Sequence, residues 1–199
     1  MTNFRRFALL APLAAVSLAG CGLNSVPTSE EKVNAEFADL QADYQRRADL
    51  IPNLVETVKA YAKQESGVLI AVTQARADAG RVQLSPADLD DPAKVDAFNA
   101  AQSRLSQAII PLQRLQEAYP DLKSNQNFLA LQDQLEGTEN RINTSRQDYN
   151  EAVRQYNTTI RTFPDAIGAK IFYGAKPKVP FKAAPAAQEA PKVDFGNQG

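Results

Sequence analysis

A long stripe of apolar residues, three or four positions apart, constrains the fold of this chain more than any other feature of its sequence. Because an α-helix has 3.6 residues per turn, residues spaced in this way lie on one face of a helix. The sequence shows no stretch with the period of two that a half-buried strand requires. The pattern therefore predicts an all-α protein. The first stripe consists of Val33, Phe37, Leu40, Tyr44, Ala48, Ile51, Leu54, Val58, Tyr61, Glu65, Val68, Val72, Ala75 and Ala79, and only Glu65 is neither apolar nor small.

Two further stripes follow the first and complete three helical limbs. The limbs occupy residues 29–79, 92–118 and 121–162, and short loops join them. Short connections between long helices favour antiparallel neighbours, as in an up-and-down bundle. At a rise of 1.5 Å per residue, straight limbs would be about 75, 40 and 63 Å long. Rods of such unequal length would leave part of the first stripe in water.

Pro52 lies inside the first limb and could divide this limb into helices of more equal length. A proline within a helix removes one backbone donor and clashes with the preceding turn, so that the helix kinks or restarts. A break near Pro52 would divide the first limb into two helices and give a four-helix bundle. A three-helix bundle with one long kinked rod is the alternative.

The sequence also marks where the bundle begins and ends. Thr28 and Glu31 have the spacing of a helix capping box, which predicts a helix that begins near residue 29. After Gly174 the chain is rich in Pro, Ala and Lys, a composition typical of a disordered or extended tail. We therefore expect a helical bundle over residues 29–173 and a disordered tail over residues 174–199.

The N-terminus has the pattern of a bacterial export signal. Arg5 and Arg6 precede an apolar run over residues 7–18, which is too short to span a bilayer of about 30 Å. We expect residues 1–20 to be a signal peptide. An ordinary signal peptide without lipid, or an uncleaved amphipathic anchor, are the alternatives.

The only cysteine stands where a lipoprotein signal would place it. The tetrapeptide that ends at Cys21 reads LAGC and resembles the box in which a cysteine is acylated and becomes the first residue. We expect Cys21 to carry the lipid and residues 21–28 to form a tether. Two or more acyl chains hold a protein stably on a membrane.

The composition limits the chemistry that this chain can perform. The sequence has no His, no Trp and a single Cys, which removes the commonest general base, His/Cys metal sites and an intramolecular disulfide. The 22 Lys and Arg residues against 23 Asp and Glu residues leave a formal charge of −1, which disfavours a general nucleic-acid binder. We expect no catalytic residue, no metal site and no cofactor.

Four charged residues fall on or beside the apolar stripes: Glu65, Arg76, Glu139 and Arg146. Antiparallel pairing of the limbs could bring them together as buried ion pairs that fix the helix register. The other interpretation places their long side chains at the edge of the seam with the charged ends in water. A catalytic carboxylate and arginine pair is a third, weaker hypothesis.

Two stretches contain sequence motifs that resemble those of a known family. Residues 46–62 read RRADLIPNLVETVKAYA, and residues 117–164 contain YPDLK, LQ-x-x-L, TEN-x-I, YN and FP in that order. On these motifs the chain resembles the LemA family over residues 30–173. The resemblance implies an extracytoplasmic antiparallel helical bundle on an N-terminal membrane segment, with no established enzymatic activity. Ala48 stands where the family commonly has tyrosine, and residues 63–65 lack its common histidine.

These features favour a membrane-tethered, non-enzymatic interaction module of the cell envelope, with an unidentified membrane or envelope protein as its partner. Gly22 follows the cysteine, which implies the periplasmic face of the outer membrane if the source is Gram-negative. A homo-oligomeric scaffold is one alternative, because seam length does not distinguish a monomer from an intermolecular coiled coil. An enzyme or ligand carrier that uses the Glu/Arg cluster is the other.

Overall fold

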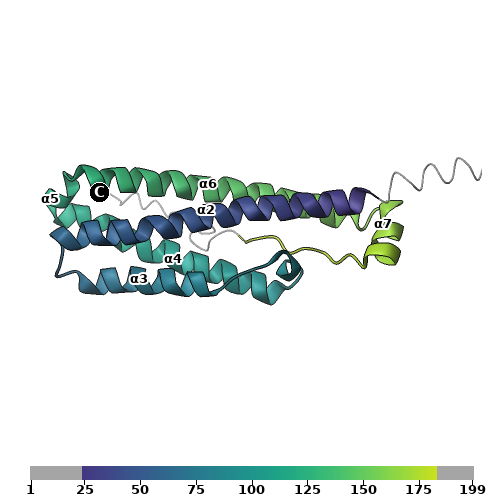
Figure 1. Cartoon of the computed structure of the whole chain (residues 1–199), viewed down its shortest axis with the longest axis horizontal. Coiled ribbons are helices and arrows are strands. Elements are labelled where there is room, and N and C mark those ends of the chain that lie inside the picture. Colours follow the sequence, from purple (N-terminus) through teal and green to yellow (C-terminus); the bar gives the residue numbers. More distant parts are fainter. Residues whose placement is uncertain (1–23, 183–199) are drawn as a thin grey trace, which may run out of the picture.

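Four long helices form most of the computed structural model, which describes residues 24–182 (Figure 1). The expected signal peptide, Cys21 and residues 183–199 lie outside the described residues. Among the described residues there is no strand, and the predicted all-α bundle is confirmed. The long helices are α2 (Ser25–Tyr61), α3 (Ser66–Arg81), α4 (Pro92–Ala118) and α6 (Gln126–Thr159). The short elements are η1 (Pro86–Asp88), α5 (Pro120–Lys123), α7 (Asp165–Gly168) and η2 (Ala169–Tyr173).

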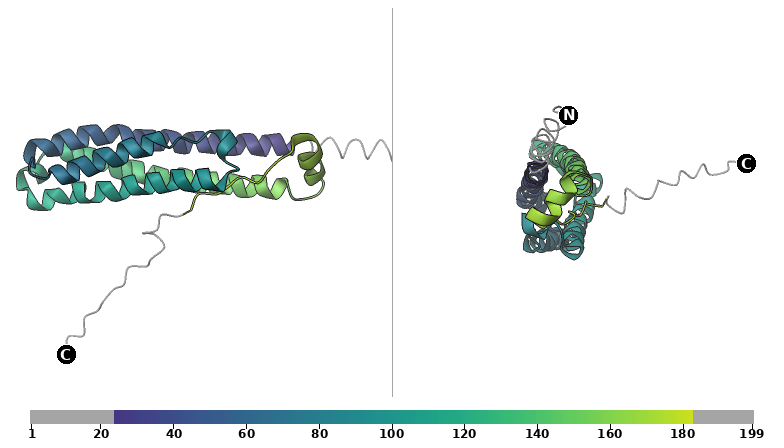
Figure 2. Two further views of the ribbon diagram at one scale, coloured as in Figure 1. Left: turned by 90° about the horizontal axis from the view of Figure 1, so that it is seen from below. Right: turned by 90° about the vertical axis from the view of Figure 1, so that its right-hand side faces the viewer.

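The helices pack in an antiparallel, up-and-down order and give an elongated rod (Figures 1 and 2). Helices α2 and α6 run side by side along its whole length, whereas α3 covers only the half of α2 that precedes the α2–α3 turn. We call the end that carries α7 and the start of α2 the proximal end. The end that carries the α2–α3 turn and α5 is the distal end. Helix α7 lies across the proximal end of the rod (Figure 2, right).

The expected break at Pro52 is wrong, because α2 continues through this residue to Tyr61. A proline at position 52 cannot donate to the carbonyl of Ala48, four residues earlier. Arg76 of α3 replaces the missing donor, since its Nε lies 2.7 Å from the Ala48 oxygen. A buried carbonyl with a partner carries no desolvation penalty, so the helix can pass through the proline. The chain turns instead at residues 62–65, and the four-helix architecture arises there.

The expected helix start at residue 29 is also wrong, because α2 begins at Ser25. Val26 is fully buried, which draws part of the expected tether into the bundle. Pro27 is compatible with this start, since the first turn of a helix has no intrahelical use for the missing N–H group. Thr28 lies within the helix and donates its hydroxyl to the Asn24 carbonyl at 2.7 Å instead of forming a capping box.

The expected disordered tail is wrong for residues 174–182, which run in an extended conformation along the bundle. Gly174 ends η2 in the left-handed conformation, with a φ of 55°, and so turns the chain back toward the helices. The backbone N–H of Val179 then donates to the Leu89 carbonyl at 2.8 Å. Phe181 inserts among the rings of Phe37, Phe98 and Tyr149.

Two asparagines of α6 form hydrogen bonds with the backbone of residues 174–182. The amide of Asn157 donates to the Lys178 carbonyl and accepts from the Lys178 N–H, both at 2.8 Å. Asn150 makes the same pair of bonds with Phe181, at 2.9 and 2.8 Å. Because seven residues make nearly two helical turns, both amides lie on one face of α6. Residues 174–182 therefore form part of the folded domain.

The interior consists of two apolar clusters. The proximal core is rich in aromatic residues and includes Phe37, Tyr44, Phe98, Tyr149 and Phe181. The distal core is mainly aliphatic and is built by α2, α3, α4 and the start of α6. Its buried residues are Ile51, Leu54, Val58, Ala62, Leu69, Val72, Ala79, Leu105, Ile109, Leu112, Leu122, Phe128 and Leu135.

Candidate functional site

A layer of buried polar residues separates the two cores. On α2, Arg47 lies between Tyr44 of the proximal core and Ile51 of the distal core. Gln102 takes the equivalent place on α4, and Thr138 with Glu139 takes it on α6. Arg47, Gln102 and Thr138 face the interior because each continues the alternation of three and four of the apolar residues around it. We call Arg47, Gln102, Ser106, Thr138 and Glu139 the polar layer.

Arg47 is the centre of the polar layer, and its side chain is only 1% exposed. Its Nη1 donates to Glu139 Oε1 at 2.8 Å and to Ser106 Oγ at 2.7 Å. Its Nη2 donates to Gln102 Oε1 at 2.6 Å and to the Gln102 carbonyl at 3.3 Å. Its buried Nε has no hydrogen-bond partner among the residues that the structure describes. One guanidinium thus joins α2 to both α4 and α6.

The charge of Arg47 is balanced by Glu139, whose side chain is 36% exposed. A buried ion pair repays its desolvation only when further hydrogen bonds satisfy the remaining donors, and Gln102 and Ser106 provide them here for both Nη atoms but not for Nε. The guanidinium also lies 5.2 Å from the centre of the Tyr44 ring, within the range of a cation–π contact. Burial raises the pKa of the Tyr44 hydroxyl above its ordinary value, so this ring is neutral at physiological pH.

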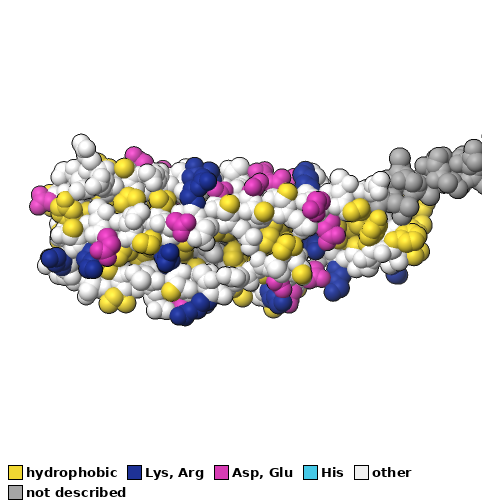
Figure 3. All heavy atoms as spheres, in the orientation of Figure 1, with side chains coloured by type: hydrophobic (Ala, Val, Ile, Leu, Met, Phe, Trp, Pro, Cys, Tyr) yellow, Lys and Arg dark blue, Asp and Glu magenta, His cyan; other side chains and the backbone are white. Residues whose placement is uncertain are grey.

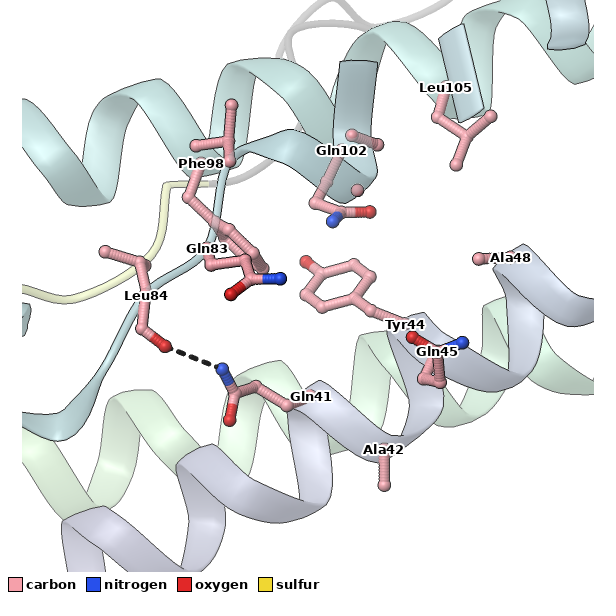
Figure 4. A pocket seen from close by; sticks show the side chains of 13 residues that line it. Gln41, Ala42, Tyr44, Gln45, Ala48, Gln83, Leu84, Phe98, Gln102 and Leu105 are labelled. Carbon is pink, nitrogen blue, oxygen red and sulfur yellow. Dashed lines mark hydrogen bonds between the residues drawn. The ribbon is translucent and has the colours of Figure 1, made fainter. Parts of the chain in front are cut away.

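Two small cavities flank the polar layer. One, of about 360 Å³, lies between α2, α4 and α6 and is lined by Arg47, Glu139 and Arg146 among others. The second, of about 410 Å³, lies between α2, the loop after α3 and α4. Figure 4 shows the ring of Tyr44 extending into this second cavity toward Gln102, while Gln41 donates to the Leu84 carbonyl at 2.9 Å. Tyr44 and Gln102 line both cavities.

The four charged residues that the sequence singled out do not form one network. Glu65 lies at the distal end, where it accepts a hydrogen bond from the Tyr119 hydroxyl at 2.9 Å. Arg76 binds the Ala48 carbonyl, as described above. Glu139 pairs with Arg47, and Arg146 lines the same cavity but donates to Asn143 Oδ1 on its own helix at 2.9 Å. All four side chains are half-buried, and Glu139 forms its ion pair with Arg47 and not with another member of the set.

The sequence analysis missed Arg47, because it placed the neighbouring Ala48 in the seam. The signal was present in the spacing. A strict alternation of three and four leads from Leu40 through Tyr44 to position 47 and then to Ile51. A cation at such a position, level with Gln102 on another stripe, predicts a buried polar layer.

A surface groove lies at the distal end, between α2 and α3. It has a volume of about 600 Å³, and its floor is apolar, with Val55, Leu69 and Ile70 among its lining residues. Ile70 is 67% exposed although it is large and apolar. Glu56, Lys59 and Lys63 stand along the rim. We call this feature the distal groove.

Residues 24–182 hold no group of three or more Asp, Glu, Cys or His side chains placed to bind a metal ion. Within the same residues, every helix is too short or too polar to cross a membrane.

Comparison with known proteins gives one clear result. The family model described as LemA family matches residues 36–195. The matched region contains the polar layer, the distal groove and the returning residues 174–182. No curated protein matches the chain.

Proposed function

Since this chain belongs to the LemA family, we propose that it is a membrane-anchored, extracytoplasmic protein that binds another protein of the cell envelope and catalyses no reaction. The export signal and the acylation box at Cys21 support the anchor. A family match by itself says nothing about a partner, so the binding role depends on the surface of the bundle.

The distal groove is the single observation that carries the binding role. From Ser25 to Val55 the continuous helix α2 rises by about 45 Å. If the rod stands upright on an anchor at Cys21, the groove lies well away from the membrane. A groove with apolar residues in its lining and an exposed Ile70 is a typical site of protein recognition.

The chemistry of the distal groove favours an amphipathic helix of the partner. Its apolar floor runs between two packed helices, a geometry that accepts a third helix through residues at helical spacing. Among the charged residues that line the groove, Lys59 is paired with Glu56 at 3.4 Å, which leaves the charge of Lys63 for a partner. We therefore propose a partner helix that carries acidic residues beside its apolar face.

The polar layer has a structural role in this proposal. Every polar group of Arg47 except Nε is used in contacts between helices, which leaves few donors for a ligand. Buried polar groups of this kind can specify a register between helices, because any other register leaves a charge without partners. The layer thus keeps α2, α4 and α6 aligned along a long rod.

In-cell crosslinking tests the proposal. A photoreactive amino acid replaces Ile70 in the distal groove, and a matched variant carries it at Ile110, an exposed apolar residue of α4 outside the groove. We expect one defined membrane or envelope protein to crosslink at position 70 and not at position 110. The same crosslink should weaken in a Cys21→Ala background, because the tether raises the local concentration of the partner.

The alternatives make different predictions in the same experiment. Crosslinks at position 70 that join only copies of this chain would indicate a homo-oligomeric scaffold. A ligand carrier would instead lose binding of a small molecule in a Glu139→Gln variant that melts at the wild-type temperature. No crosslink at either position would contradict the binding role.

A further inference from the structure

The proximal end carries a patch of exposed apolar side chains that are not part of the buried core. Phe163, Ile171 and Phe172 are 81%, 69% and 68% exposed, and Ile167 is also exposed. We call these four residues the proximal patch. Figure 3 shows apolar side chains gathered at the end of the rod where α7 lies. Single exposed apolar residues are common on proteins, but four large ones within ten residues at one end mark an interaction site.

The proximal patch is the outer face of a short amphipathic segment. Gly168 and Ala169, in the same segment, are buried against the bundle. The side chain of Ser25 donates to Asp165 Oδ1 at 2.6 Å, which joins α7 to the first turn of α2. The segment is thus held in place from inside, while its larger apolar side chains point away from the core.

The start of the chain determines which surface lies near the patch. Cys21 precedes Ser25 by four residues, a distance that an extended chain spans in at most about 14 Å. The hydrogen bond between Ser25 and Asp165 places the patch at this same end. A lipid on Cys21 would therefore hold the proximal patch beside the bilayer surface.

The charges around the patch fit the same surface. Lys170 lies within the segment and Arg161 shortly before it, and both side chains are exposed. Cations beside an apolar face are typical of segments that lie in the interface of a membrane with anionic lipids. The nearby carboxylate of Asp165 is half-buried and accepts a hydrogen bond from the neutral Ser25 hydroxyl, so it keeps its negative charge and offsets one of the two cations.

We propose that the proximal patch inserts into the membrane interface and forms a second membrane contact besides the lipid. This inference rests on the proposed acylation of Cys21. The apolar side chains of α7 and η2 enter the headgroup and acyl-chain boundary, and Lys170 and Arg161 contact the anionic headgroups. The two contacts together make the rod stand on the bilayer with its distal end outward.

Tryptophan quenching tests the insertion, because the chain has no tryptophan of its own. The full chain, acylated in its bacterial host, is reconstituted into vesicles of phosphatidylethanolamine and phosphatidylglycerol with brominated acyl chains. One variant carries Phe172→Trp in the patch, and the matched control carries Ile70→Trp at the distal end. We expect the emission of the patch tryptophan to fall by about half, because an interfacial segment reaches roughly 5–10 Å into the bilayer. The control emission should stay unchanged.

A charge in the patch provides a second test. Ile167→Glu in the Phe172→Trp protein should reduce the quenching, whereas Ile110→Glu on α4 should leave it unchanged. Both positions are exposed, so neither change should unfold the bundle. Circular dichroism of each variant checks this point.

The possible results distinguish a failure of the proposed patch insertion from a failure of the proposed lipid anchor. The mass of the reconstituted protein reports directly whether Cys21 is acylated. An acylated protein whose patch tryptophan is not quenched would overturn the insertion and leave the anchor intact. Equal quenching at positions 172 and 70 would also overturn it, since the rod would then lie flat. A protein without acyl mass would contradict the anchor, and with it the premise of this inference.

Discussion

The proximal and distal halves of the bundle complete their apolar cores with different elements. In the distal half, α3 supplies the fourth helix, and the core is built mainly from Leu, Ile and Val. In the proximal half α3 is missing, and residues 174–182 with the loop after α3 complete an aromatic core around Phe181. Helices close a core with local hydrogen bonds, whereas an extended segment needs side chains such as Asn150 and Asn157 to satisfy its backbone. The proximal half therefore depends on contacts that are distant in sequence.

Phe181 offers the strongest test of this difference between the two cores. Replacement with alanine should cost about 4 kcal/mol, because a buried phenylalanine loses its burial energy and leaves a cavity. Hydrogen exchange should show the loss in the proximal half, with the distal core protected. Lys182→Ala is the control, since its ion pair with Asp96 is exposed and should be worth less than about 1 kcal/mol. Equal stability of the two variants in urea would contradict the role given to this segment.

The polar layer couples the two halves, and Glu139 is its accessible partner. Glu139→Ala should cost about 3 kcal/mol, because it leaves the buried charge of Arg47 without its counterion. The double variant Arg47→Met with Glu139→Gln should lose less, since no buried charge remains unpaired. Urea denaturation of the wild-type protein and the two variants measures this. A double variant less stable than Glu139→Ala would argue against an uncompensated charge as the cause.

Within the distal half, Arg76 and Pro52 should behave as a coupled pair. Arg76→Met should cost about 1.5 kcal/mol, because the Ala48 carbonyl loses its partner. In a Pro52→Ala background the new N–H group of residue 52 can bind this carbonyl, and the cost of Arg76→Met should shrink. A double-mutant cycle measures the coupling, which we expect to be about 1 kcal/mol. Strict additivity would contradict the explanation for the unbroken helix.

High pH should weaken the proximal half first, with a smaller effect than the substitutions. Burial raises the pKa of Tyr44 and of Tyr149, and it raises the pKa of Tyr156 to about 12 with help from nearby Glu30 and Asp90. All three belong to the proximal core. The folded state favours the neutral rings, so their contribution is complete below the unfolded value of about 10 and is lost as the pH rises further. Tyrosinate absorbance and circular dichroism, recorded together, should change in one step.

The helices were predictable from the sequence because their cause is local. Asp91, for example, caps α4 from the residue directly before it, with its carboxylate accepting from the Ala93 N–H at 2.9 Å. The errors concern contacts between distant residues. The effect of Pro52 depends on Arg76, and the order of residues 174–182 depends on Asn150 and Asn157 of α6.

The candidate site was predictable only in part, for a related reason. Glu139 was identified because it lies beside an apolar stripe, but its partner Arg47 was hidden by the choice of Ala48 for the seam. A long cation is unexpected in a core, and its burial becomes favourable only when Gln102 and Ser106 of α4 meet it. The segment that carries the proximal patch buries Ala169 against the bundle end, while Ile171 and Phe172 point outward.

Neutron reflectometry of the acylated protein on a supported bilayer tests the central claim most directly. An upright rod anchored at its proximal end gives a protein layer of about 55 Å, the length of the 37-residue helix α2. A layer of this thickness, which thins when Ile167→Glu is introduced, is the result that we predict. A layer of about 20 to 25 Å, two helix diameters thick, would show a rod lying flat on the membrane and would contradict the account.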